Sequence, residues 1–354
     1  MNIVMVAGHA CIRVQKMALA LIEKGHTVHL ISKGVPQYHE YYNTFCNAIH
    51  ANNYTEAIEI YASVADVFHV HNEPSWFVSA IKERCDTPVV LDVHDSFLTR
   101  TTAEEQEELT KDGSMQSRIF TEERNNFQIA DALVFPASKF ASIIRKEFRL
   151  EQPHLILPSM VPKMLYRYNT REWMGGLVYE GRVDLKSKIE SSNLQHGFRY
   201  CDYSEFAKSA HTVGIDFHLY TTKYNNDEFK ELYDDISYVH AAVPFADLLP
   251  AISRHDWGLV GNITKTPEWD VALPNKLFEY IAANVPVVAM NADVCGKFIL
   301  EHGVGIVVQD LKELAERWSE HETVRANLIK VRQSLSMDAH IHKLEDLYRE
   351  VINE

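Results

Sequence analysis

The chain has 354 residues, of which 46% are hydrophobic and 24% charged, a composition typical of a globular protein with enough core for two domains. Its formal net charge of −14 disfavours a general affinity for nucleic acids, because lysine and arginine that neutralise phosphates supply most non-specific binding of that kind. The five cysteines are odd in number, scattered and free of C-x-x-C spacing, so we expect reduced thiols rather than disulfides or a zinc site.

The sequence also carries no signal for a membrane span or a metal centre. No apolar run approaches the roughly 20 residues that a transmembrane helix requires. The first residues, MNIVMVAG, show neither a basic region nor a cleavage site, so we expect no integral membrane segment and a cytoplasmic protein. The 18 histidines form no H-x-x-x-H or H-E-x-x-H pattern, and we therefore expect no metal site.

The N-terminal part has the pattern of a β-α-β unit. Residues 3–6 predict a strand, residues 12–24 a helix and residues 27–31 a second strand. Gly8 lies in the first turn, where a residue without a Cβ lets the backbone approach a phosphate or a sugar at the positive end of the helix. A tight turn without a ligand explains Gly8 equally well, and the absence of G-x-G-x-x-G disfavours an NAD or FAD site.

Two further strands, predicted at residues 65–71 and 88–94, end in polar residues. In an open α/β sheet, ligands lie beyond the carboxyl ends of the strands. The residues expected there are His71, Asn72, Glu73, His94 and Asp95. A single histidine at a strand end is more often structural, and the pattern alone leaves that alternative open. The charged segment 101–129 follows and predicts a solvated helix or a mobile acceptor loop.

The C-terminal half repeats the alternation of strands and helices. Strands are predicted at residues 177–180, 215–220, 236–240, 256–260, 286–290 and 303–308, and a helical tail at 311–335. This pattern predicts an α/β fold with two doubly wound, Rossmann-like domains, residues 1–170 and 171–335, followed by a C-terminal helix within 336–354.

The segment 273–291, LPNKLFEYIAANVPVVAMN, is the most informative stretch. Pro274 suits the first turn of a helix, and Asn284 tolerates the left-handed conformation in which helices often end. Between them, Glu279 is surrounded in sequence by apolar residues. For a single glutamate, a position on the solvated face of the helix is the ordinary explanation.

This segment resembles glycosyltransferase family 4, whose P-N-K-x-x-E-Y-x-A-A-x-x-P-V-V-A pattern places a glutamate on the nucleotide ribose. The chain matches the pattern at Pro274, Asn275, Lys276, Glu279, Tyr280, Ala282, Ala283, Pro286, Val287, Val288 and Ala289. The resemblance implies that Glu279 binds both ribose hydroxyls, with Leu277 and the other residues at the start of this helix beside the nucleotide. It also implies the GT-B architecture, in which two Rossmann-like domains face an interdomain cleft, the second domain holds the nucleotide and the C-terminal helix crosses back to the first.

The resemblance extends to the strand ends. Gly181-Arg182 resembles the family's G-R, which implies that Arg182, with Lys186 or Lys188, neutralises the departing diphosphate. The family's lysine lies five residues after the arginine, where this chain has Ser187, and a surface basic cluster is the alternative. The D-V-x-H-V-H and L-x-x-H-D patterns imply that His94 points at the reacting sugar. The resemblance also implies that the Gly8 turn lies beside the donor diphosphate and the acceptor, with Arg13 and Lys16 lining its exit.

One position departs from the family. Many members carry a second glutamate eight residues before the first, where it binds the donor sugar, but this chain has Val271 there. Either Glu268 or Asp270 takes over that role, or backbone N–H groups of residues 264–273 hold the sugar.

The prediction is therefore a retaining glycosyltransferase that uses a nucleotide-diphosphate sugar, such as a UDP-sugar, as donor substrate and needs neither a cofactor nor a metal. The acceptor stays open between a glycan, a lipid-linked sugar, a protein and a modified nucleobase, of which the acidic charge disfavours DNA. The alternatives are a GT-B nucleotide-sugar epimerase or phosphorylase, and a non-catalytic nucleotide-sugar-binding subunit, which Val271 makes conceivable. The sequence does not indicate an oligomeric state.

Overall fold

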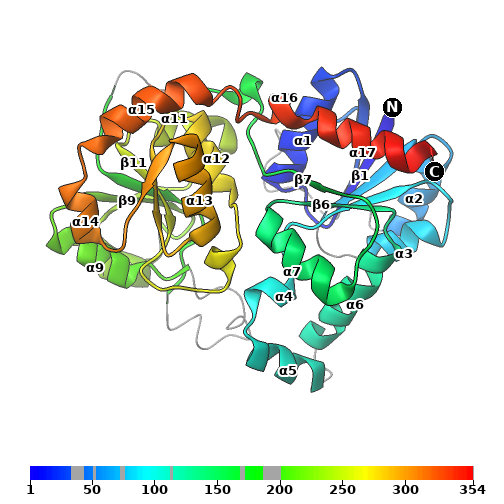
Figure 1. Ribbon diagram of the computed structural model, residues 1–354, viewed down its shortest axis with the longest axis horizontal. Coiled ribbons are helices and arrows are strands. Elements are labelled where there is room, and N and C mark those ends of the chain that lie inside the picture. The colour runs from blue at the N-terminus through cyan, green and yellow to red at the C-terminus, as the bar shows by residue number, and fades with distance from the viewer. Residues whose placement is uncertain are drawn as a thin grey trace. The chain divides into compact units, whose positions relative to one another are not determined.

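The computed structural model describes residues 1–353 except 33–43, 51–52, 72–75, 112–114, 168–171 and 186–200. The chain forms two compact units, the first made of Met1–Pro162 and Met337–Glu354 and the second of Lys163–Ser336 (Figure 1). The boundary expected at residue 170 lies outside the described residues, and the units separate between Pro162 and Lys163. None of the described helices is long and apolar enough to cross a lipid bilayer.

The first unit is built on a parallel sheet with the order β3-β2-β1-β4-β5-β6-β7. Its strands are β1 (Asn2–Ala7), β2 (Thr27–Ser32), β3 (Asn47–His50), β4 (Val67–His71), β5 (Val89–Asp92), β6 (Ala132–Phe135) and β7 (His154–Ile156). Its helices are α1 (Ile12–Glu23), α2 (Tyr54–Ala62), α3 (Phe77–Lys82), α4 (Phe97–Arg100), α5 (Ala103–Lys111), α6 (Met115–Ile129), α7 (Ser138–Phe148), α16 (Met337–His340) and α17 (His342–Asn353). The strand order reverses between β1 and β4, which is the point where open sheets bind ligands.

The central strands of this sheet are buried along almost their whole length, as parallel strands covered on both faces are. Helix α1 packs onto the sheet through Val14, Met17 and Leu21. Gly25, which follows the end of this helix, has φ 86°. The segment 101–129 forms two helices, α5 and α6, rather than one.

The last eighteen residues belong to the first unit. The backbone N–H of Met337 donates to Val161 O at 3.2 Å, and α17 buries Leu344 and Tyr348. The Tyr348 hydroxyl lies 2.5 Å from Nδ1 of His69 on β4. This helix therefore completes the cover over one face of the first sheet.

The second unit is built on a parallel sheet with the order β10-β9-β8-β11-β12-β13. Its strands are β8 (Leu177–Glu180), β9 (Phe217–Thr221), β10 (Tyr238–Ala241), β11 (Trp257–Gly261), β12 (Val287–Met290) and β13 (Gly305–Val307). Its helices are α9 (Ser204–Thr212), α10 (Asp227–Tyr233), α11 (Phe245–Ile252), α12 (Asn275–Ala282), α13 (Asp293–His302), α14 (Leu311–Glu316) and α15 (Glu320–Val331), with 3-10 turns η2 (Lys163–Leu165) and η4 (Glu268–Asp270). Here the order reverses between β8 and β11.

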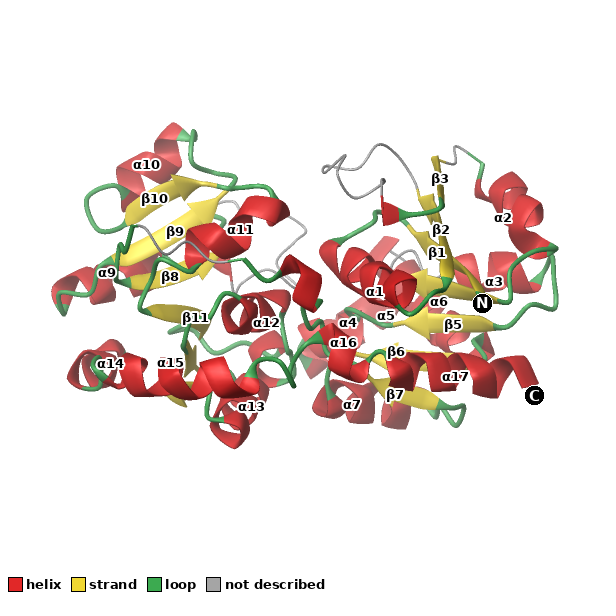
Figure 2. Cartoon of the chain, turned by 90° about the horizontal axis from the view of Figure 1, so that it is seen from above, coloured by secondary structure: helices red, strands yellow, loops and turns green. Residues whose placement is uncertain are grey.

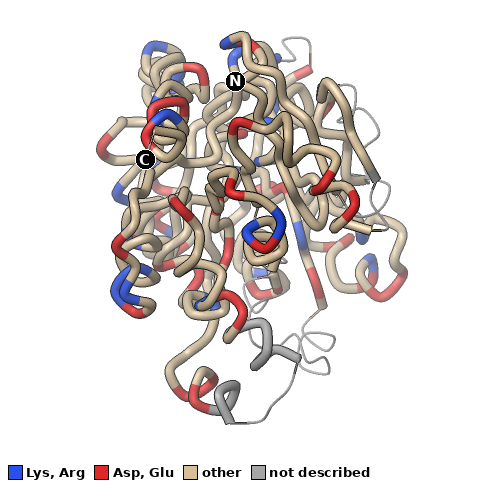
Figure 3. Tube along the Cα trace, turned by 90° about the vertical axis from the view of Figure 1, so that its right-hand side faces the viewer, with Lys and Arg blue, Asp and Glu red and all other residues tan. Residues whose placement is uncertain are grey.

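The strands of each unit are flanked by helices (Figure 2), and in the second unit a hydrophobic cluster joins the sheet to α9, α10 and α14. The predicted fold class, two doubly wound α/β domains, is confirmed. The cleft expected between the domains stays a prediction. The expected helical tail 311–335 is two helices, because the chain turns at residues 317–319. Acidic and basic residues are interspersed along the described trace (Figure 3), so the acidic excess is spread over many elements.

Candidate active site

Tyr280 fixes helix α12 against β8, the first strand of the second unit in sequence. Its hydroxyl donates to Val178 O at 3.2 Å and accepts from the backbone N–H of Glu180 at 3.3 Å. Gly258 on β11 makes the close approach possible, because a Cβ there would lie 2.5 Å from the Tyr280 ring. The helix ends as predicted, with Asn284 in the left-handed conformation at φ 62°.

Glu279, on the same helix, is 3% exposed. The alternative that it lies on a solvated helix face is therefore wrong. Taking a carboxylate out of water is costly unless it is hydrogen-bonded or paired, so a glutamate at this depth requires polar partners.

The start of α12 meets the turn that follows β8. Gly181 has φ 129°, a conformation that favours glycine, and a Cβ on it would lie 3.5 Å from Nζ of Lys276. The same ammonium lies 4.8 Å from the ring centroid of Tyr179 and 5.8 Å from that of Trp269, so aromatic faces hold it in place. A lysine, a helix N-terminus and a glycine turn thus converge where the strand order reverses, between β8 and β11.

Arg182 follows this turn and is half-exposed. Its guanidinium forms an ion pair with the carboxylate of Asp184, which also lies 3.6 Å from Nζ of Lys223. Lys186 and Lys188, the two lysines expected to assist Arg182, lie outside the described residues.

The loop before α12 carries the residues that we expect to replace the family's sugar-binding glutamate. Val271 is 4% exposed, so its position is an ordinary apolar one. Glu268 and Asp270 lie on the 3-10 turn η4, where the Asp270 carboxylate is 3.2 Å from Nζ of Lys265. The choice between these two carboxylates and the backbone stays open.

A second polar cluster lies in the first unit, around the carboxyl end of β5. Arg13 donates through Nε and Nη2 to the two oxygens of Asp92 at 2.8 and 2.9 Å, and also to Leu157 O at 2.8 Å. Burial by itself raises the pKa of Asp92, but Arg13 and then His94 outweigh it and hold that pKa well below its usual range. Asp92 is therefore a carboxylate at neutral pH.

The expectation that Arg13 and Lys16 line the exit of the Gly8 turn is wrong. Arg13 is 3% exposed and Lys16 is fully buried, where its ammonium donates to Ser159 O at 3.3 Å. Both side chains lie on the face of α1 that packs onto the sheet, and they tie this helix to Asp92 and to the segment 157–159.

His94 joins this cluster from the end of β5. Its Nε2 lies 3.2 Å from Oδ2 of Asp92 and 3.3 Å from Nδ1 of His71, and its Nδ1 lies 3.7 Å from Sγ of Cys11. Burial disfavours the imidazolium, but Asp92 and Cys11 outweigh burial and raise the pKa of His94 to about 10. His71 behaves in the opposite way, because its burial lowers its pKa to about 4 despite the contact with Asp92.

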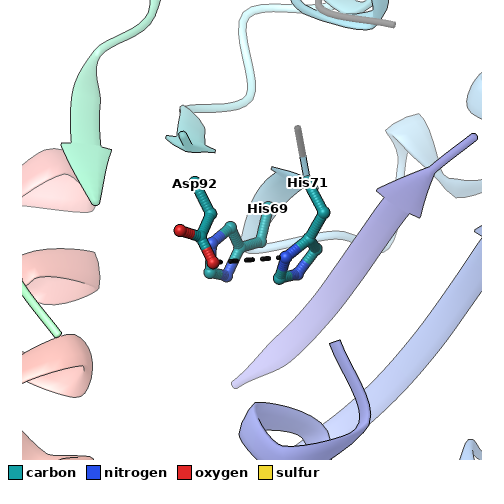
Figure 4. Close-up of side chains that lie close together, drawn as sticks. All are labelled: His69, His71 and Asp92. Atoms are coloured by element: carbon teal, nitrogen blue, oxygen red, sulfur yellow. Dashed lines mark ion pairs between the residues drawn. The ribbon is translucent and has the colours of Figure 1, made fainter. Parts of the chain in front are cut away.

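His69, His71 and Asp92 have the side-chain types of a metal centre, and their nearest ligand atoms lie within 4.8 Å of one another (Figure 4). Both Asp92 oxygens, however, already accept hydrogen bonds from Arg13, whose positive charge opposes a cation at the same place. We assign this group as a buried ion-pair network. Cys11 is the member of the cluster that the sequence did not indicate, although its place at the start of the first helix of a β-α-β unit is one where a thiol pKa is often lowered.

Comparisons with known proteins agree with this architecture. Residues 199–343 match the family model described as glucosyltransferase 3-like, C-terminal domain. None of the curated proteins matches the chain in sequence.

Several solved structures resemble the chain over nearly its whole length. Sucrose-phosphate synthase from Thermosynechococcus elongatus has a TM-score of 0.72 at 12% identity, over 100% of both chains. Anabaena HepE in complex with UDP has a TM-score of 0.67 at 10% identity, over 99% of this chain and 100% of that one. An alpha-glucosyltransferase in complex with UDP has a TM-score of 0.61 at 13% identity, over 100% of both chains. The chain therefore has the two-domain α/β fold of the GT-B glycosyltransferases.

Proposed function

We propose that the protein is a glycosyltransferase that moves a sugar from a nucleoside-diphosphate sugar to an acceptor with retention of the anomeric configuration. The observation that carries the proposal is the approach of Lys276 to the Gly181 turn, beside the point where the second sheet reverses its strand order, with Glu279 buried on the same helix as Lys276. The similar structures of HepE and of the alpha-glucosyltransferase were solved with UDP, which makes a UDP-sugar the first donor to test.

The role proposed for each residue follows from the charge of its side chain and from how deeply that side chain is buried. Glu279 accepts hydrogen bonds from the two ribose hydroxyls, as a buried carboxylate with two acceptor oxygens can. Lys276 and the glycine turn hold the diphosphate. Arg182 stabilises the negative charge that grows on the diphosphate as the glycosidic bond breaks, and it exchanges Asp184 for that anion.

His94 is proposed to act at the reacting sugar. With its pKa raised to about 10 it is an imidazolium at neutral pH, and its positive charge suits the oxygen of a sugar hydroxyl or a departing phosphate. Asp92 and Arg13 fix the orientation of its ring.

A second candidate, a nucleotide-sugar-binding subunit without catalysis, is favoured by one observation. Val271 is buried at the position of the family's sugar-binding glutamate, so the donor sugar has one expected contact fewer. Transfer to any acceptor would exclude this candidate. Conversion of the donor without an acceptor would instead support an epimerase or a phosphorylase.

The experiment is a thermal-shift screen of UDP, GDP and their sugars, followed by donor turnover with candidate acceptors and NMR assignment of the product anomer. We expect a uridine or guanosine diphosphate to raise the unfolding temperature. Lys276→Met should weaken that nucleotide by roughly tenfold or more, as loss of a charged hydrogen bond does.

A matched control is Lys230→Met, because Lys230 on α10 also lies over a tyrosine ring, 5.6 Å from the centroid of Tyr224. It should leave nucleotide affinity unchanged. The proposal fails if no nucleotide stabilises the protein, or if both lysine variants bind it equally well.

A further inference from the structure

Cys11 lies in the turn after β1, at the position that caps α1 (Ile12–Glu23), with an extended backbone at φ −78° and ψ 171°. It is partly exposed, and its Sγ lies 3.7 Å from Nδ1 of His94. This is hydrogen-bonding distance for a thiol and an imidazole. The two residues come from different strand ends of the first sheet, on either side of the reversal between β1 and β4.

The imidazole is held in one orientation from its other nitrogen. Nε2 of His94 lies 3.2 Å from Oδ2 of Asp92, a carboxylate with no exposed surface, and Arg13 holds both oxygens of that carboxylate. The proton on Nε2 is thus directed at Asp92, which leaves Nδ1 to face the sulfur. A nucleophile, a base and a group that orients the base are aligned in that order.

We propose that Cys11 is a nucleophilic thiolate, paired with the His94 imidazolium and oriented through Asp92, and that it is a site of covalent modification by soft carbon electrophiles. Sugar transfer as proposed above makes no use of a thiol. The proposal therefore concerns a further chemistry of this chain, which shares His94 with that reaction but does not require it.

The charges around the pair favour its ionised form. The groups that face it are Asp92 from β5, His71 from β4 and Arg13 from α1, and the charges of Asp92 and Arg13 offset one another. Burial by itself raises the pKa of Cys11, but His94 and the backbone N–H groups of Val14 and Arg13, at the positive end of α1, lower it overall.

The reaction needs no oxidant or reductant. With iodoacetamide as the probe, an electron pair on the Cys11 sulfur forms the S–C bond while the C–I bond breaks and iodide leaves. The thiol proton has already passed to Nδ1 of His94 and stays there. The adduct stands directly beside the imidazole, 3.7 Å from its nitrogen before reaction.

The chain supplies its own controls. Cys46 is exposed, whereas Cys201 and Cys295 are fully buried, and burial raises the pKa of Cys295 to about 12. We therefore expect Cys11 to react faster than Cys46 at pH 6.5 although it is less exposed, and Cys295 not to react in the folded protein.

The test is the rate of iodoacetamide labelling at each cysteine, followed by peptide mass spectrometry between pH 5.5 and 9.5 on the full chain. The labelling profile of Cys11 should lie at lower pH than that of Cys46. In His94→Asn, the rate at Cys11 should fall about fivefold or more at pH 6.5 and its profile should move to higher pH, while the rate at Cys46 stays the same.

Coincident profiles for Cys11 and Cys46 in the unmodified protein would overturn the proposal, and this comparison needs no variant that might fail to fold. An unchanged Cys11 profile in a folded His94→Asn variant would overturn the pairing. Cys11→Ser identifies the labelled peptide, because the fast signal must disappear in it.

Discussion

Replacement of Glu279 by glutamine tests the nucleotide site most directly, because it keeps the shape of a side chain that is 3% exposed and removes only its charge. The contacts that fix α12, from the Tyr280 hydroxyl to Val178 and Glu180, are untouched. An amide can accept with one oxygen only, and hydrogen bonds to charged groups contribute about 1.5–3 kcal/mol. UDP affinity should therefore fall roughly tenfold to a hundredfold.

The assay is thermal and urea unfolding with and without UDP, so that any effect of the substitution on the free protein cancels within each variant. At a UDP concentration of about 100 times the wild-type Kd, a ligand stabilises by about 2.7 kcal/mol, and the same concentration should stabilise Glu279→Gln by only about 0.4–1.4 kcal/mol. The matched control is Glu316→Gln on α14, whose carboxylate is 67% exposed and 4.0 Å from Lys312. Equal UDP stabilisation of wild type and a folded Glu279→Gln variant would refute the assignment.

Two further predictions concern residues proposed to act in sugar transfer. Arg182→Ala should lower kcat by more than it raises the donor KM, because charge on the diphosphate grows in the transition state. Arg182→Lys should recover part of the loss. Wild-type turnover of Arg182→Ala at saturating donor and acceptor would instead make Arg182 a surface residue paired with Asp184. His94→Ala should abolish most transfer yet leave the UDP affinity measured by calorimetry unchanged, since the residues proposed to hold the nucleotide belong to the other unit. A parallel loss of UDP binding would contradict this division.

The thiolate–imidazolium pair should also give stability a pH optimum. The pKa of His94 is raised to about 10 in the fold, so protonation of His94 stabilises the folded protein, and this contribution is lost as pH rises through that value. The pKa of Cys11 is lowered, so ionisation of Cys11 stabilises the folded protein, and this contribution is lost in acid. Unfolded histidine and cysteine titrate near 6.5 and 8.5, so the contribution of the pair should be greatest between about pH 6.5 and 8.5. Urea unfolding across pH 5–10 should show this optimum and a flatter profile in His94→Asn; superimposable profiles would count against the pair.

The sequence predicted the two sheets well because buried parallel strands appear as short apolar runs, and few other elements produce runs of that length and composition. Leu177–Glu180 forms β8 with the expected bounds, and Asn284 ends α12 as expected. The local sequence pattern could not predict that Glu279 is buried, since a glutamate among apolar residues can lie on the buried or on the exposed face of a helix. Only the resemblance of the surrounding motif favoured the buried side.

The polar cluster of the first unit shows why the rest could not be predicted. The resemblance placed Arg13 and Lys16 at the exit of the Gly8 turn, yet both side chains are buried. Their partners Asp92 and Ser159 lie 79 and 143 residues away in sequence. The Cys11–His94 contact spans 83 residues, and no motif that includes His94 points to Cys11. Pairings of this kind depend on the register of the strands and on where α1 crosses them. The local periodicity of the sequence gives no information on either.

The return of the C-terminal helices to the first unit has a consequence for how the protein is made. His69 on β4 emerges early from the ribosome, but its partner Tyr348 lies 279 residues further on. The first unit must wait, with the sheet face under α17 uncovered, while all of Lys163–Ser336 is synthesised, on the order of ten to forty seconds at typical elongation rates. The second unit, which is one continuous segment, can complete its fold first, so the order of maturation is the reverse of the order of synthesis.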